Sequence, residues 1–150
     1  MKRLAIGQHV VEYVAKATNE YGNFGAAVGI GLQELRADRW ELIAGVAYAD
    51  YNGPNCVAHI ASDGSRKWMT KRYLWTIFDY PFSQLGVNRI TCMIGSKNAA
   101  SINLCERLGF ERETTLQGAH PDGDLFIYRQ FRSSCKWINI DFGKRYALAA

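Results

Sequence analysis

Alternating apolar and polar positions predict most of the β-strands of this chain. In residues 26–35 and again in residues 40–51, apolar side chains fall on every second position. A period of two is typical of a strand with one buried face. The polar residues 36–39 between these segments predict a turn, so the two strands form an antiparallel hairpin. The same reasoning predicts further strands at residues 56–61, 87–94, 110–116 and 125–132.

Apolar residues three or four positions apart predict three helices. Residues 8–18 have valines at helical spacing, and residues 65–85 carry a long apolar stripe. Pro81 lies inside the second segment, and because proline lacks an N–H we expect a kink there. Residues 99–108 form a short helix between the capping residue Asn98 and a following glycine.

The order of these elements predicts an α+β fold. A helix is followed by three strands, a helix, a strand, a helix and two strands, which indicates one mixed sheet covered by helices. The passage from strand 56–61 through the long helix to strand 87–94 should be a right-handed parallel crossover. The 150 residues suit a single domain. We assign the domain to residues 1–137 and treat residues 138–150 as a C-terminal tail.

Composition narrows the class of protein. Hydrophobic residues make up 48% and charged residues 21% of the chain, which argues against a disordered protein. No segment approaches the roughly 18 consecutive apolar residues of a membrane span, so we expect no membrane partner. The first residues lack the apolar core and cleavage site of a secretory signal.

The four cysteines bear on the cellular location of the protein, as the absence of a secretory signal does. Cys56, Cys92, Cys105 and Cys135 form no C-x-x-C pair, and three of them lie inside apolar runs, so we expect neither a zinc site nor a disulfide framework. We interpret them as reduced thiols that pack in the core. This interpretation predicts a reducing, cytoplasmic location.

The net charge of +4 gathers at one predicted helix start. Four basic residues fall in the first two turns of helix 65–85: Arg66, Lys67, Lys71 and Arg72. A helix N-terminus carries partial positive charge, so cations there are unfavourable unless an anion binds. Free backbone N–H groups with flanking cations make a phosphate site. The alternative is a solvated basic face capped by Asp63.

Three sequence features carry a resemblance to a known family. Residues 79–90 read as helix end, glycine and strand, and Asn98-x-x-Ser101-x-x-Leu104-x-x-x-Leu108-Gly109-Phe110 follows. The third feature is a closing strand at 124–132, followed by Cys135-Lys136-Trp137. Residues 26–137 therefore resemble the GNAT superfamily of N-acyltransferases. The branch that it resembles most acetylates protein N-termini, including those of ribosomal proteins. Within the family, the variant seen in phage-encoded proteins is the most similar.

The resemblance implies a mostly antiparallel, twisted sheet whose central parallel strands, 56–61 and 87–94, splay apart. It also implies acetyl-CoA as acyl donor, with the pantetheine arm in the gap and the pyrophosphate at the start of the long helix. Trp68 stands where the family has a glycine, so the backbone can approach a phosphate only if the indole points away. The cofactor-binding residues implied are Ile60, Ala61, Gly64, Ser65, Arg66, Lys67, Trp68, Met69, Lys71, Asn98 and Ser101.

The catalytic candidates follow from what acyl transfer to an amine requires. His59 is the candidate base, because an unperturbed imidazole titrates near neutral pH. A backbone N–H of Ile60 or Ala61 would polarise the thioester carbonyl. Cys105 occupies the position of the family's proton-donating tyrosine. The hydroxyl of Ser101 is a second candidate for the proton donor nearby. The alternatives are that His59 is a core histidine hydrogen-bonded to backbone and that Cys105 only packs.

Other residues are candidates for substrate contact. The resemblance implies that Tyr21, Asn23 and Phe24 border the acceptor cleft. His120, in the last hairpin loop, is a further candidate.

The resemblance predicts an acetyl-CoA-dependent N-acetyltransferase in which a primary amine attacks the thioester directly. The acceptor could be a protein N-terminus, a lysine or a small amine such as a polyamine. The alternatives are a non-catalytic module that binds CoA or nucleic acid, and an auxiliary protein of a larger assembly. We do not expect nucleic acid as a partner, because Trp68, Tyr73 and Trp75 do not share one helix face. No metal is expected, and a homodimer is left open.

Overall fold

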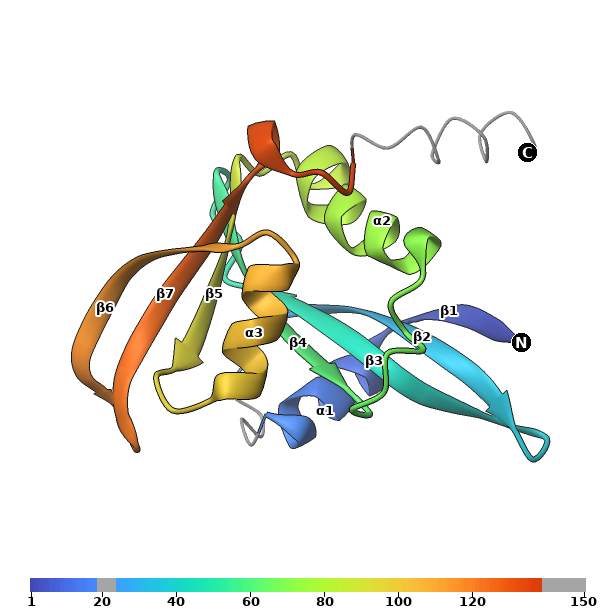
Figure 1. Ribbon diagram of the computed structural model, residues 1–150. Coiled ribbons are helices and arrows are strands. Elements are labelled where there is room, and N and C mark those ends of the chain that lie inside the picture. The colour runs from blue at the N-terminus through green and yellow to red at the C-terminus, as the bar shows by residue number, and fades with distance from the viewer. Residues whose placement is uncertain (19–23, 139–150) are drawn as a thin grey trace.

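The computed structural model describes residues 1–18 and 24–138, which form a seven-stranded mixed sheet flanked by three α-helices (Figure 1). The strand order is β1-β2-β3-β4-β5-β7-β6, with β4 and β5 parallel and all other neighbours antiparallel. This is the predicted α+β fold with a central parallel pair. The strands are β1 Lys2–Ile6, β2 Val28–Arg36, β3 Arg39–Ala49, β4 Asn55–Ser62, β5 Arg89–Gly95, β6 Glu111–His120 and β7 Gly123–Phe131. The helices are α1 Gln8–Ala17, α2 Lys71–Asp79 and α3 Ala99–Arg107, with a π-helical turn at Tyr80–Gln84 and a 3₁₀ turn at Arg132–Ser134. None of these described helices could cross a membrane.

One strand was not predicted. β1 is an edge strand that pairs antiparallel with β2, from Lys2 opposite Glu34 to Ile6 opposite Ile30. It has five residues, of which Ala5 is buried and Leu4 half-buried, so it leaves almost no pattern in the sequence. The other predicted elements are present, with modest shifts at most of their ends.

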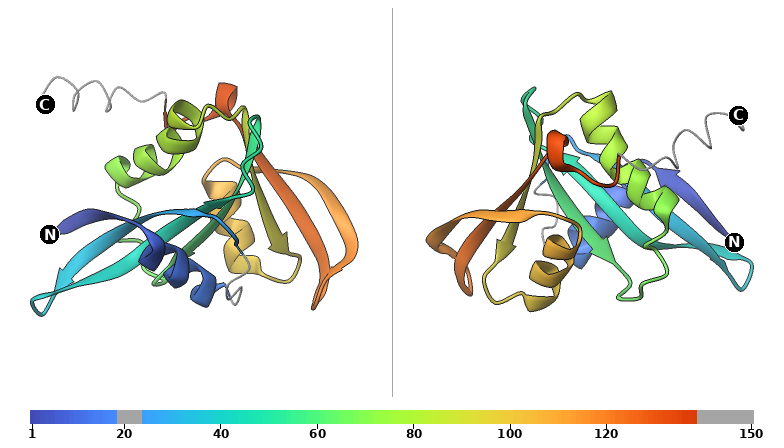
Figure 2. Two further views of the ribbon diagram at one scale, coloured as in Figure 1. Left: turned by 180° about the vertical axis from the view of Figure 1, so that it is seen from behind. Right: turned by 45° about the horizontal axis from the view of Figure 1, so that its top comes forward.

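The two faces of the sheet carry two packing clusters. The larger core lies between the sheet and the helices α2 and α3, and it includes Trp68, Phe82 and Tyr128. The smaller cluster lies under α1, where Val14 meets Ala47 and Ala61. Figure 2 shows α1 on the opposite side of the sheet from α2 and α3. We call these sides the α2 face and the α1 face.

Glycine lets α1 approach β2 closely. A β-carbon added at Gly29 would lie 2.8 Å from the Val10 Cβ and 2.9 Å from the Val11 backbone nitrogen. Both distances are below any normal van der Waals contact, so only glycine fits at this position. The glycines of the predicted strand 26–35 therefore lie where α1 packs against the sheet.

The predicted kink at Pro81 takes the form of a π-helical turn. α2 ends at Asp79, and the Leu85 N–H then bonds the Tyr80 carbonyl at 3.0 Å, five residues back. Because Pro81 has no N–H, the Ile77 carbonyl four residues earlier loses its helical donor. The Tyr48 hydroxyl of β3 donates to that carbonyl instead. Tyr48 thereby satisfies a buried acceptor that proline leaves open.

The predicted start of the long helix at residue 65 is wrong. α2 begins at Lys71, and Thr70 is its N-cap, with the Thr70 side chain accepting a hydrogen bond from the Tyr73 N–H at 3.2 Å. Asp63 is therefore not the cap. Residues 63–70 form a loop, which we call the α2 loop. Of the basic group, Arg66 lies in this loop with Lys67, while the other two residues lie in the first turn of α2.

Candidate cofactor and active site

The parallel strands β4 and β5 separate along most of their length. The two strands pair only where Asn55–Val57 faces Arg89–Thr91, and the Thr91 hydroxyl bonds the Asn55 side chain at 2.7 Å at this closed end. Beyond it, β4 runs on to Ser62 beside β3, and β5 runs on to Gly95 beside β7 (Figure 1). The predicted splay is present. Its two inner strand edges carry backbone N–H and C=O groups that an extended ligand can pair with.

Strand alternation sorts the β4 candidates between the two faces of the sheet. Ala58 belongs to the larger core and Ile60 packs against it, so both face α2. Ala61 belongs to the α1 cluster, and His59 shares its face. A ligand threaded through the splay would therefore meet His59 from one side of the sheet and Ile60 from the other.

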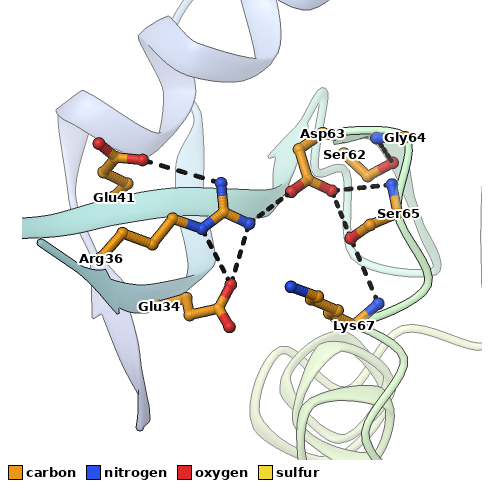
Figure 3. Close-up of polar contacts among 8 residues, drawn as sticks. All are labelled: Glu34, Arg36, Glu41, Ser62, Asp63, Gly64, Ser65 and Lys67. Atoms are coloured by element: carbon orange, nitrogen blue, oxygen red, sulfur yellow. Dashed lines mark hydrogen bonds and ion pairs between the residues drawn. The ribbon is translucent and has the colours of Figure 1, made fainter.

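The α2 loop continues directly from β4 and is shaped by its own polar side chains (Figure 3). Asp63 Oδ1 accepts hydrogen bonds from the Ser65 N–H at 2.9 Å and from the Ser65 hydroxyl at 2.7 Å. The Ser65 oxygen accepts from the Lys67 N–H at 3.3 Å, and the Ser62 hydroxyl oxygen accepts from the Gly64 N–H at 3.2 Å. Gly64 has φ +88°, which favours glycine. These hydrogen bonds hold a turn in a segment for which the spacing of apolar residues predicted a helix.

Three backbone N–H groups, two in this loop and one at the first residue of α2, have no hydrogen-bond acceptor among the described residues. Within the described part of the chain, the N–H groups of Arg66, Trp68 and Lys71 donate no hydrogen bond. The side chains of Arg66 and Lys67 are exposed beside them. Open amides with flanking cations are what an anionic phosphate requires.

The side chain of Trp68, which stands where the family has a glycine, points away from the exposed side of the α2 loop. Its side chain is only 2% exposed, and its ring meets Tyr73 edge-on, with centroids 6.1 Å apart. The Tyr73 hydroxyl in turn donates to the Ile30 carbonyl at 2.8 Å, and burial raises the pKa of that phenol. The indole therefore points into the core, away from the exposed side of the loop.

His59 stacks on Phe24. The two ring centroids are 4.0 Å apart, and the planes are inclined by 21°. His59 is half-buried, on the part of β4 that has left β5. The structure thus joins two sequence candidates, the base and one residue assigned to the acceptor cleft. The other two, Tyr21 and Asn23, lie outside the described residues.

The candidates on α3 occupy different environments. Asn98 caps the helix, because its side-chain oxygen accepts from the Ser101 N–H at 3.2 Å. Ser101 is half-buried, whereas Cys105 is 4% exposed and lies in the larger core. The thiol of Cys105 contacts Cys92 of β5, and this hydrogen bond, together with burial, raises the pKa of Cys92. All four cysteines are buried, and none of them forms a disulfide.

His120 packs across the end of β5. A β-carbon at Gly95 would lie 2.7 Å from the His120 Nε2, so glycine is what admits the imidazole. His120 Nδ1 accepts a hydrogen bond from the Asp122 N–H at 3.2 Å, which leaves Nε2 as the ring's donor. Gly95 shares the α1 face with Thr91, four residues earlier on β5. His120 therefore stands at the open end of the splay, on the same face as His59.

A cavity of about 750 Å³ lies elsewhere in the molecule. It is lined by Trp75, Asn88, Phe131 and Arg132, among others, at the closed end of the β4–β5 pair. None of the predicted site residues lines it.

Sequence reasoning missed one residue that touches the α2 loop. Arg36, at the end of β2, contacts the Asp63 carboxylate, with Nη2 and Oδ2 3.0 Å apart. The two residues are far apart in sequence, and nothing in the local pattern of either one signals the other.

Comparison with known proteins places the fold. No family model and no curated protein sequence matches the chain. Among solved structures, the N152L mutant of spermidine N-acetyltransferase SpeG from Vibrio cholerae aligns with a TM-score of 0.68 at 14% identity, over 92% of this chain and 96% of that one. The same enzyme in complex with CoA and spermine gives a TM-score of 0.66 at 14% identity, over 92% and 98%. Ribosomal-protein-S5-alanine acetyltransferase from Vibrio fischeri gives 0.59 at 16% identity, over 86% and 72%. With its splayed parallel pair inside a seven-stranded mixed sheet, the chain has a GNAT-like fold and is structurally similar to acetyl-CoA-dependent N-acetyltransferases.

Proposed function

We propose that this protein is an N-acetyltransferase that moves the acetyl group of acetyl-CoA to a primary amine. The observation that carries the proposal is the junction of the splay with the α2 loop. The splay offers unpaired strand edges to a pantetheine arm, and the loop offers open amides and the cations Arg66 and Lys67 to a pyrophosphate. At the loop, Gly64, Ser65, Trp68, Met69 and Lys71 would line the pyrophosphate. Ile60 and Ala61 would line the pantetheine arm together with Asn98 and Ser101.

The chemistry is a direct displacement at the thioester. The amine nitrogen attacks the carbonyl carbon and forms the C–N bond while the carbonyl oxygen takes up negative charge. A backbone N–H of Ile60 or Ala61 would donate to that oxygen. The C–S bond then breaks, the amine proton passes to His59, and a proton passes to the departing thiolate of CoA.

Two side chains near α3 are candidates for the thiolate's proton donor. Ser101 is half-buried at the start of α3, whereas Cys105 is 4% exposed and hydrogen-bonded to Cys92. A proton donor must reach the leaving sulfur, so of the two candidates Ser101 is the more accessible.

The described residues favour a protein N-terminus as acceptor over a polyamine. Past the splay, no helix of the described residues lies over the α1 face of β5, β7 and β6, and Met93 and Leu116 on this face are 43% and 44% exposed. Glu111 and Glu113 on β6 are each ion-paired with an arginine, at 3.2 Å and 3.0 Å. A polycation requires free carboxylates, whereas a peptide can lay an apolar side chain on this face.

The burial of the aromatic residues around the α2 loop weighs against the nucleic-acid alternative. Trp68 and Tyr73 are 2% and 1% exposed, so neither can stack on a base. A non-catalytic CoA-binding module and an auxiliary assembly protein remain the competing hypotheses.

Product detection tests the proposal. The protein is incubated with acetyl-CoA and, in turn, a peptide with a free apolar N-terminus, a lysine side-chain amine and spermidine, and acetylated product is measured by mass spectrometry. We expect acetyl transfer to the peptide. Acetyl-CoA should also raise the unfolding temperature more than a random oligonucleotide does, because a ligand that binds only the folded state stabilises it. Binding of acetyl-CoA without any product would instead favour the non-catalytic module.

His59→Ala addresses the base. We expect kcat at saturating acetyl-CoA to fall by about a hundredfold, the lower end of what general bases contribute. His9→Ala is the matched control, because His9 is exposed on α1 and should leave kcat unchanged. An unaltered kcat in His59→Ala would remove the base assignment without affecting the acetyltransferase proposal.

A further inference from the structure

We propose that Arg36 is a positioning residue for the acyl donor, because its guanidinium holds the α2 loop in shape and neutralises Asp63 beside the phosphates. The inference rests on the proposed function, since it takes the α2 loop as the phosphate site. Arg36 would touch neither the cofactor nor the reacting atoms.

The guanidinium of Arg36 is fixed from several sides (Figure 3). Its Nη2 lies 2.9 Å from Glu34 Oε2 and 3.0 Å from Asp63 Oδ2, and its Nη1 lies 3.8 Å from Glu41 Oε2. Its Nε also donates to Glu34 at 3.0 Å. A planar guanidinium is suited to this role, because it can serve two carboxylates at once where an ammonium is a single point charge.

A chain of hydrogen bonds carries this order into the loop. One oxygen of Asp63 takes the guanidinium, and the other takes both the N–H and the hydroxyl of Ser65. The Ser65 oxygen then accepts the Lys67 N–H. Three links therefore connect Arg36 to the backbone of Lys67, next to the open amides of Arg66 and Trp68.

The backbone of Asp63 is tied to the same hairpin. Its N–H donates to the Ile43 carbonyl of β3 at 2.8 Å. The side-chain and backbone bonds of Asp63 thus join the start of the loop to the β2–β3 hairpin. Trp68, buried in the core, holds the other end of the loop.

The charges give Arg36 a second effect on anion binding. Burial opposes the charge on Asp63, but hydrogen bonds from Ser65 and Arg36 lower the pKa of its carboxyl below the ordinary value. The hydrogen bond from Arg36 likewise lowers the pKa of Glu34. Both carboxylates are therefore ionised at neutral pH, and without the guanidinium Asp63 would repel a phosphate bound to the adjacent amides.

Arg36→Gln is the main test, with Arg39→Gln as the matched control. Arg39 is an exposed arginine at the other end of the same two-residue turn. We expect the KM for acetyl-CoA and the Kd for free CoA to rise about fivefold in Arg36→Gln, in keeping with a partly exposed charge network. We expect kcat to stay within about twofold, because the reacting groups are untouched. Arg39→Gln should match the wild type in all three, and Arg36→Lys should recover part of the affinity.

A double-mutant cycle separates positioning from general destabilisation. Asp63→Asn alone should weaken CoA binding, and adding Arg36→Gln should weaken it little further, because Arg36 acts through Asp63. All binding is measured well below the unfolding temperature of each variant. Additive effects, or a Kd for CoA unchanged in Arg36→Gln, would overturn the inference while leaving the proposed function standing. If the wild-type protein itself binds no acetyl-CoA, both are overturned.

Discussion

The two strands that border the splay each lead into a helix, and the two connections differ in what they can bind. β4 is followed by the eight residues 63–70 before α2, and β5 by the three residues 96–98 before α3. Both helices are capped by a side-chain oxygen, from Thr70 and from Asn98, and neither has an acidic residue in its first turn. The two helix N-termini are therefore capped in the same way, although only the first turn of α2 carries basic residues, Lys71 and Arg72.

The difference lies in the loops. The α2 loop folds back on itself through Asp63 and Ser65, leaves amides open and carries two exposed cations. The connection to α3 is a short turn in which the Asn98 N–H bonds the Gly95 carbonyl at 3.0 Å, and Lys97 is its one basic residue. A helix N-terminus alone is therefore not what makes the candidate phosphate site. The loop before it is.

Trp68→Ala should give the largest loss of stability. It removes the buried side chain that anchors the α2 loop in the core, and the connection before α3 has no such anchor. Truncating a fully buried tryptophan leaves a cavity, and we expect the free energy of unfolding to fall by about 3–5 kcal/mol, measured by chemical denaturation. Trp75→Ala, a half-buried tryptophan on α2, is the control and should cost clearly less. A loss below about 1 kcal/mol in Trp68→Ala would mean that the loop does not depend on this residue.

Removing the loop cations tests the comparison directly. In Arg66→Gln/Lys67→Gln we expect the Kd for acetyl-CoA to rise at least about tenfold, because hydrogen bonds to charged groups are worth roughly 1.5–3 kcal/mol. The difference from wild type should shrink at high salt, since the cations are exposed. Lys97→Gln before α3 is the matched control and should change the Kd by less than about twofold. Equal effects of the two sets of substitutions would show that the two loops do not differ in anion binding.

Asn98→Ser gives the smallest expected effect and asks whether Asn98 does more than cap α3. Serine caps about as well as asparagine, so the free energy of unfolding should stay within about 0.5 kcal/mol of wild type. If the Asn98 side chain also lines the pantetheine arm, as proposed, and hydrogen-bonds it through the amide nitrogen, the KM for acetyl-CoA should rise about threefold. Steady-state kinetics and thermal unfolding measure the two separately, and an unchanged KM would reduce Asn98 to a cap.

Most elements of the fold follow from local pattern. The strand alternation of residues 26–51, the break at Pro81 and the capped helix after Asn98 were all predictable, because each depends on neighbours within a few residues. The start of α2 was not. Arg66 and Lys67 were predicted to lie in the helix, whereas they lie in the α2 loop, because an apolar residue at helical spacing can equally be a loop anchor such as Trp68.

The amino-acid sequence by itself determined the order of the elements that follow β1, the clustering of the cations and the resemblance that pointed to an acyl donor. Only the tertiary structure decided which residues share a site. It put His59 on the α1 face against Phe24 and put Cys105 in the opposite core. It also joined Arg36 to Asp63. The physical reason is that these are contacts between distant segments, which depend on strand register and on which face each side chain takes, and a one-residue shift in register reverses that face.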